Sequence, residues 1–175
     1  MAALLAGMAP AAYASTHPAK AATAANAIHL AGEADVVIAL VAQLEEAVRL
    51  SSTMAATSRT SPLHGFAQKE IKKRTGQITQ LRKWCRRWFD DSCSKADAAS
   101  LTQNTPINDL TYASAMSANH ARLLEVIEFG FGLKPRKAAR ELMEQIQKES
   151  YDELAFLEQS AGTPAGRPPQ SRNKR

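Results

Sequence analysis

Two residues with metal-binding side chains, Met116 and His120, lie four positions apart in a segment with helical periodicity. Side chains at this spacing project from one face of an α-helix. A thioether and an imidazole suit a soft or borderline ion, copper(I) above all. Asn119 is a weaker ligand, and Glu149 or Glu153 would complete the site from a facing helix, as in other bundle-core metal sites. The sequence therefore offers one copper site in the second half of the chain.

A structural role for the same residues is the alternative interpretation. Methionine at an apolar position usually fills a core, and a single histidine on an apolar stripe is usually hydrogen-bonded in the interior. The Glu-x-x-His pairs of di-iron carboxylate bundles do not occur in the sequence. The sequence also has no Gly-rich phosphate loop, no G-x-S-x-G and no visible pairing of a nucleophile with a base. It predicts a protein that is not an enzyme.

Basic residues gather between Lys69 and Arg87, where eight lysines and arginines face one acid. Because most of them lie off the apolar stripe of their segment, this stretch predicts a helix with a basic outer face. Such a face suits an anionic partner: nucleic acid, anionic lipid or an acidic protein. The candidate anion-binding residues are Lys69, Lys72, Lys73, Arg82, Lys83 and Arg86. The alternative is a solvated face of a bundle helix with its tryptophans in the core.

The chain has two cysteines, Cys85 and Cys93, eight positions apart. This spacing differs from the Cys-x-x-Cys of redox and zinc sites. In an exported protein the two cysteines are expected to form a disulfide that pins the end of a helix. In the cytosol they would be free thiols.

The first 14 residues form a short apolar run that ends in Ala12-Tyr13-Ala14, a cleavage pattern typical of a signal peptide. The run is too short to span a membrane, and it lacks the basic residues that usually precede such a run. We expect a periplasmic or secreted protein, or a cytoplasmic one if residues 1–14 are not a signal. Residues 15–31 are expected to be a flexible linker, and residues 160–175, rich in Pro, Gly and basic residues, a disordered tail.

Four segments carry apolar residues at the three- and four-residue spacing of amphipathic helices. Ser61-Pro62 and Thr105-Pro106 mark two helix starts, since proline is favoured at the first helical position after an N-cap. Four such stripes can be buried only against each other. The chain therefore predicts an all-α protein, an antiparallel four-helix bundle over residues 32–159, built from two similar hairpins at about 32–90 and 105–159.

An offset of 76 residues places Leu44 on His120, as expected for a duplicated hairpin. In the first hairpin the informative residues are Ala47-Val48-Arg49-Leu50-Ser51, Arg74, Gln77, Ile78, Leu81 and Trp84. In the second hairpin they are Met116-Ser117-Ala118-Asn119-His120. These residues resemble the bacterial family called domain of unknown function 305. Its first helix carries Met-Ile-x-His-His-x-x-Ala-Ile-x-Met-Ala, and its second carries Gln-x-x-Glu-Ile-x-x-Met-x-x-Trp.

The resemblance covers about residues 35–159 and implies a ferritin-like bundle, export and metal binding. Gln43 and Leu44 stand where the family has two histidines, and the second hairpin retains one of them as His120. The resemblance therefore implies a non-enzymatic exported bundle protein whose metal site is largely lost. An anion-binding module that uses the basic helix 69–87 is the alternative function.

Overall fold

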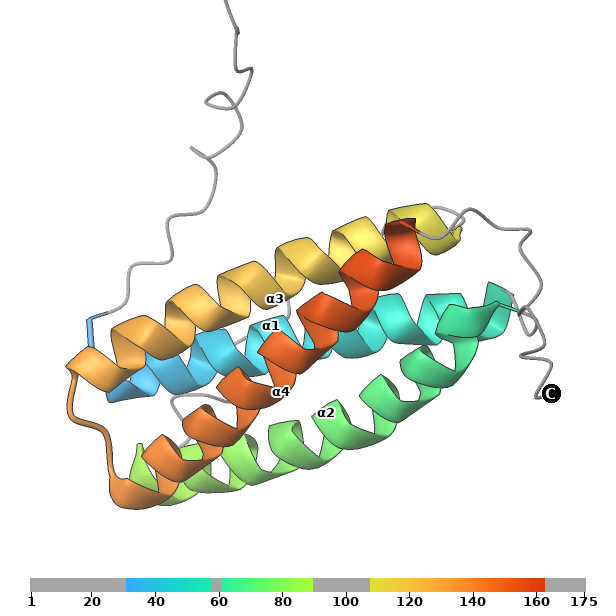
Figure 1. The fold of residues 1–175 in the computed structure, drawn as a ribbon. Helices are drawn as coiled ribbons and strands as arrows, with labels where there is room; N and C mark the ends of the chain where they lie inside the picture. Colours follow the sequence, from blue (N-terminus) through green and yellow to red (C-terminus); the bar gives the residue numbers. More distant parts are fainter. Residues whose placement is uncertain (1–30, 58–60, 90–107, 163–175) are drawn as a thin grey trace, which may run out of the picture.

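The computed structural model describes residues 31–57, 61–89 and 108–162. They form four helices, α1 (Glu33–Thr57), α2 (Pro62–Trp88), α3 (Asp109–Gly132) and α4 (Lys137–Gly162), and no strand occurs among them (Figure 1). This confirms the all-α prediction. None of these four helices is long and apolar enough to cross a membrane. The predicted signal peptide, almost all of the predicted linker and nearly all of the predicted tail lie outside the described residues.

The start of α2 follows the sequence prediction, whereas the start of α3 does not. Ser61 caps α2, its hydroxyl accepting a hydrogen bond from the Leu63 amide, and proline occupies the first turn. The cap of α3 is Asn108, which forms a capping box with Thr111. Thr105-Pro106, which we expected to begin this helix, lies outside the described residues. The Asn108 side chain satisfies the free amides of the first turn and so begins α3 later.

Neighbouring helices run in opposite directions around the bundle (Figure 1). The Ser51 hydroxyl and the Tyr112 hydroxyl are hydrogen-bonded at 2.9 Å, and Asn119 donates to the backbone carbonyl of Gln43 at 3.0 Å. Residues later in α3 therefore contact residues earlier in α1, so these two helices are antiparallel. The first turns of α2 and α3 are joined by a side-chain hydrogen bond, so these two helices begin at the same end.

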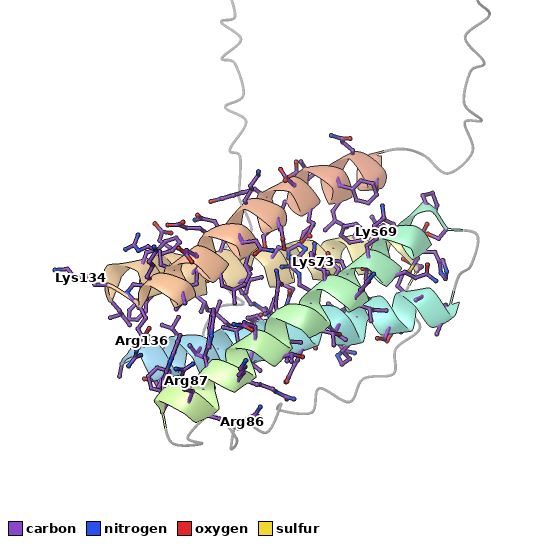
Figure 2. The ribbon with its side chains drawn as sticks, turned by 90° about the horizontal axis from the view of Figure 1, so that it is seen from below. Lys69, Lys73, Arg86, Arg87, Lys134 and Arg136 are labelled. Atoms are coloured by element: carbon purple, nitrogen blue, oxygen red, sulfur yellow. The ribbon has the colours of Figure 1, made fainter. Side chains whose placement is uncertain are left out.

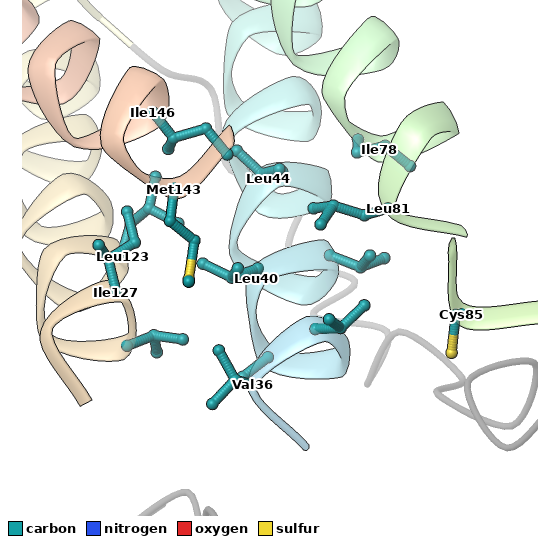
Figure 3. Packing of buried hydrophobic residues seen from close by; sticks show 14 residues of the cluster. Val36, Leu40, Leu44, Ile78, Leu81, Cys85, Leu123, Ile127, Met143 and Ile146 are labelled. Atoms are coloured by element: carbon teal, nitrogen blue, oxygen red, sulfur yellow. The ribbon is translucent and has the colours of Figure 1, made fainter. Parts of the chain in front are cut away.

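The apolar core consists of two clusters, one after the other along the bundle. The first joins all four helices near the start of α1 and includes Val36, Leu40, Leu44, Leu81, Leu123, Ile127, Met143 and Ile146 (Figure 3). The second lies near the start of α3 and includes Met54, Leu63, Ala67, Tyr112, Met116 and Leu157. Along α2, α3 and α4, the residues between the two clusters include the buried polar ones. The core is therefore interrupted by a polar layer.

Polar residues interrupt the buried apolar faces of α2 and α4. On α2, Ile71 is only half-buried, whereas the polar residues Glu70, Arg74 and Gln77 are buried. On α4 the buried residues are Ala139, Met143, Ile146, Ser150, Glu153 and Leu157. The neighbouring apolar residues Ala138, Leu142 and Leu154 are exposed or only half-buried. The cause is the polar layer: α4 turns Ser150 and Glu153 inward, toward the charged residues of α2.

Candidate metal centre

Arg74 lies at the centre of a buried ion network between α2 and α4. Its side chain is 0% exposed, and its Nε donates to Glu70 Oε2 at 3.0 Å while its Nη2 donates to Glu153 Oε2. Its Nη1 donates to Gln77 Oε1 at 3.0 Å and lies 3.6 Å from Glu149 Oε2. A guanidinium can serve all these acceptors because its donors form a planar fork. At this level of the bundle, α2 and α4 are joined by charge.

Lys73 supplies a second cation to the same two carboxylates. Its Nζ lies 2.5 Å from Glu70 Oε1 and is also paired with Glu153 Oε1. The prediction that Lys73 belongs to the outer basic face is therefore wrong. Its side chain is only 29% exposed and lies between α2 and α4 (Figure 2). It turns inward because two buried carboxylates need compensating charge.

His120 of α3 faces the same network. Its side chain is 0% exposed, and its Nε2 lies 3.2 Å from Glu153 Oε2. Neither ring nitrogen forms a hydrogen bond with any described residue, so the interior histidine with hydrogen-bond partners, the alternative from the sequence, is not what the structure contains. A buried polar atom without a partner costs about 1–3 kcal/mol. Such an atom in a native protein points to an ion or a water molecule.

Glu70, His120 and Glu153 together form a group that can hold a metal ion. One ligand atom from each residue lies within 4.8 Å of the others, all three residues are buried, and each comes from a different helix. Ligands of a tetrahedral ion with bonds of ~2.1 Å lie ~3.4 Å apart. Modest side-chain movements therefore suffice to bring the three donors around one ion.

The protonation state of His120 suits a ligand. Burial lowers the pKa of His120 from 6.5 to about 4, and the positive charge of Arg74 lowers it as well. The ring is therefore neutral at pH 7, and one nitrogen carries a free lone pair. A metal ion that binds this nitrogen has no proton to displace.

The structure brings together two of the five predicted metal ligands, His120 and Glu153. Met116 belongs to the second apolar cluster, and the amide nitrogen of Asn119 donates to Gln43. Met116 is thus packed among apolar side chains, whereas Asn119 is held through its amide nitrogen while its Oδ1 has no hydrogen-bond partner among the described residues.

Glu149, the remaining predicted ligand, is a half-buried acceptor for Gln77 and Gln145. Glu70 is a member of this group that the sequence did not predict. The available signal was the pair Glu70 and Arg74, four positions apart, at the spacing of the buried stripe of α2.

Contacts between the hairpins obey the 76-residue offset found in the sequence. Gln43 and Asn119, which the offset makes equivalent, are hydrogen-bonded to each other. The offset makes Gln77 equivalent to Glu153, and Lys73 equivalent to Glu149. The hydrogen bond between Gln77 and Glu149 is therefore the counterpart of the ion pair between Glu153 and Lys73. Equivalent contacts that exchange in this way are expected around a twofold axis. The structure thus agrees with two similar hairpins.

The same offset locates the counterpart of the metal-binding group. His120 corresponds to Leu44, Glu70 to Ile146 and Glu153 to Gln77. Leu44 and Ile146 are both 0% exposed and belong to the first apolar cluster. The fold therefore packs well with apolar side chains at these positions, and the ionisable group on the other side of the axis is not a requirement of the bundle.

Five of the basic residues of α2 are exposed and form no ion pair with described residues: Lys69, Lys72, Lys83, Arg86 and Arg87. Arg82 is paired with Glu45 of α1. Lys69 lies near the start of α2, and Arg86 and Arg87 lie near its end (Figure 2). The rings of Trp84 and Trp88 stack at 5.0 Å between centroids, and both are half-buried. The tryptophans thus belong partly to the surface.

Cys85 is 1% exposed and disulfide-bonded. Cys93 lies outside the described residues, so the pairing of these two cysteines stays a prediction.

Comparison of the chain with protein-family models, with curated proteins and with solved structures finds no match. The resemblance to the domain of unknown function 305 family therefore stays a prediction from the sequence.

Proposed function

We propose that the protein is a non-enzymatic helical-bundle protein that binds one divalent metal ion through Glu70, His120 and Glu153. The observation that carries this proposal is the ring of His120, which is wholly buried beside a carboxylate with neither nitrogen hydrogen-bonded. The counterpart Leu44 supports it, because an apolar residue at this position is compatible with the fold. A bound cation would give one of these ring nitrogens a partner.

The donor set favours a divalent ion over copper(I). One imidazole nitrogen and carboxylate oxygens suit Zn²⁺, Mn²⁺ or Fe²⁺, whereas copper(I) prefers sulfur ligands. Met116, the sulfur donor of the sequence prediction, lies in an apolar cluster. The same nitrogen and oxygen donors also bind Cu²⁺ strongly. If the bound ion is copper, we therefore expect Cu²⁺ and not copper(I).

We also propose that the bundle is ferritin-like and that the protein is exported. Antiparallel neighbours, with α2 and α3 beginning at the same end, support a ferritin-like arrangement with one long connection between α2 and α3. The disulfide-bonded Cys85 supports export, because structural disulfides persist in oxidising compartments.

Metal titration of the purified full chain tests the metal site. After removal of bound ions with a chelator, calorimetric titration with Zn²⁺, Mn²⁺ and Cu²⁺ at pH 7.5 should show one ion per chain for at least one of them. His120→Leu should lose this binding. His64→Leu is the matched control, since His64 lies in the first turn of α2 and outside the ion network. Equal affinity in the wild type and His120→Leu, or no binding at all, would contradict the proposal.

A second candidate function is binding of single-stranded nucleic acid by the basic face of α2. The observation that favours it is the set of five exposed cations without ion-pair partners among the described residues, near a half-buried stack of two tryptophans. Cations that follow a phosphate backbone and aromatic rings that stack on bases are the general features of such sites. This face would act independently of the buried metal site.

A salt titration tests the second candidate. Fluorescence anisotropy of a labelled single-stranded oligonucleotide should show binding at low salt that weakens steeply as salt is added. Lys83→Gln with Arg86→Gln should weaken binding at every salt concentration. Lys148→Gln, which removes an exposed charge from α4, should have little effect. Absence of binding at low salt removes this candidate.

A further inference from the structure

The two cations of the ion network hold different oxygens of the same carboxylates. Arg74 is bonded to Oε2 of Glu70 and to Oε2 of Glu153. Lys73 is paired with Oε1 of Glu70 and Oε1 of Glu153. Both cations therefore bridge α2 and α4, and Lys73 does so with a single ammonium between two oxygens. That is the arrangement in which a metal ion bridges two carboxylates.

The two cations also differ in how freely they can leave. The side chain of Arg74 is 0% exposed and is held by three hydrogen bonds, whereas that of Lys73 is 29% exposed. A lysine ammonium is a point charge on a flexible stem, without the fixed fork of a guanidinium. Lys73 can therefore rotate into solvent while Arg74 keeps the two helices together.

Charge balance favours exchange of Lys73 for a divalent ion. The network's three acids, Glu70, Glu149 and Glu153, outnumber its two cations by one. Replacing the Lys73 ammonium with a divalent ion makes this group neutral, and a monovalent ion leaves the negative charge uncompensated. Buried groups that carry net charge are unfavourable. The network is therefore matched to a dication.

We propose that Lys73 occupies the metal position in the metal-free protein and moves to solvent when a divalent ion binds between Glu70 and Glu153. This inference rests on the proposed metal-binding function. The lysine acts as a competitor that weakens the apparent affinity, because the ion binds only when the ammonium has left. Removing Lys73 should therefore strengthen metal binding more than removing an equal charge from a neighbouring exposed position does.

The test compares Zn²⁺ affinity in three variants of the full chain at pH 7.5. Lys73→Gln should bind Zn²⁺ about tenfold more tightly or better, since the competing cation is gone. Lys72→Gln, the matched control, removes the same charge from the neighbouring exposed position and should stay within about twofold of the wild type. Lys73→Arg keeps the competing charge and should not gain affinity. Thermal unfolding of each variant with and without Zn²⁺ confirms that it is folded.

Amine labelling followed by mass spectrometry gives a second readout on the wild type. Acetylation of Lys73 should accelerate when Zn²⁺ is added, while acetylation of Lys72 should not change. If the wild type binds Zn²⁺ but Lys73→Gln gains no affinity and the labelling of Lys73 is unchanged, the exchange of lysine for metal is overturned and the metal site stands. If neither protein binds any of the tested ions, both proposals fail.

Discussion

Replacing His120 with leucine should change how the stability of the metal-free protein depends on pH. Leucine is the residue that the first hairpin has at the equivalent position, Leu44, which is 0% exposed in the core. The substitution removes two buried nitrogens that have no hydrogen bond. In the presence of a chelator at pH 7.5, we expect His120→Leu to be at least as stable as the wild type, with a gain of up to about 2 kcal/mol.

The size of the pH effect follows from the pKa of His120. Burial, with Arg74 nearby, lowers this pKa from 6.5 to about 4 in the folded protein. Below pH 6.5 the unfolded chain takes up a proton that the folded protein refuses, so the wild type loses stability as the pH falls from 6.5 toward 4. At about 1.4 kcal/mol per pH unit, the full loss is about 3 kcal/mol, of which about 2 kcal/mol appears by pH 4.5.

Urea unfolding followed by circular dichroism at several pH values between 7.5 and 4.5 measures this difference. The other three histidines and all the carboxylates are present in both proteins, so their contributions largely cancel in the comparison. The stability advantage of His120→Leu should grow by about 2 kcal/mol between pH 7.5 and 4.5. Parallel stability curves would refute the reasoning, because they would mean that His120 titrates alike in the folded and unfolded chains.

Five further substitutions test other parts of the structure by urea denaturation. Arg74→Met should destabilise the protein by about 3–5 kcal/mol, because it leaves two buried carboxylates short of a cation, whereas Arg82→Met at an exposed ion pair should cost less than about 1 kcal/mol. Gly76→Ala should stabilise the open face of α2 by about 1 kcal/mol. Gly130→Ala should instead cost about 1–2 kcal/mol, since its Cβ would lie 2.9 Å from a neighbouring valine. Tyr112→Phe should cost about 1–2 kcal/mol by breaking a buried hydrogen bond to a serine.

The all-α fold was predictable from the sequence because the three- and four-residue apolar spacing of four segments indicates helices and not strands. The sequence was less informative about which face of each helix is buried. On α4, Ala138 and Ala139 are adjacent, as are Leu142 and Met143, so two registers offer apolar residues equally well. The structure selects the register of Ala139 and Met143. What decides between them is Glu153, a charged residue that a rule of apolar stripes assigns to the surface.

The candidate site was predictable only in part for the same reason. His120 and Glu153 could be proposed because histidine and a facing carboxylate are familiar ligands in helical bundles. Glu70 was missed, because it lies in a strongly basic stretch and its burial depends on Arg74, which is buried with it. Each charged residue is tolerated inside only because the other is there. Periodicity treats positions one at a time and does not detect such a pair.

The most direct test of the central claim is anomalous X-ray diffraction from crystals of the protein grown with Zn²⁺. The account predicts an anomalous peak about 2.0–2.2 Å from a ring nitrogen of His120 and from carboxylate oxygens of Glu70 and Glu153. It also predicts that the Lys73 ammonium has left these oxygens. Absence of an anomalous peak among these three residues, with the ammonium still between the two carboxylates, would contradict the account.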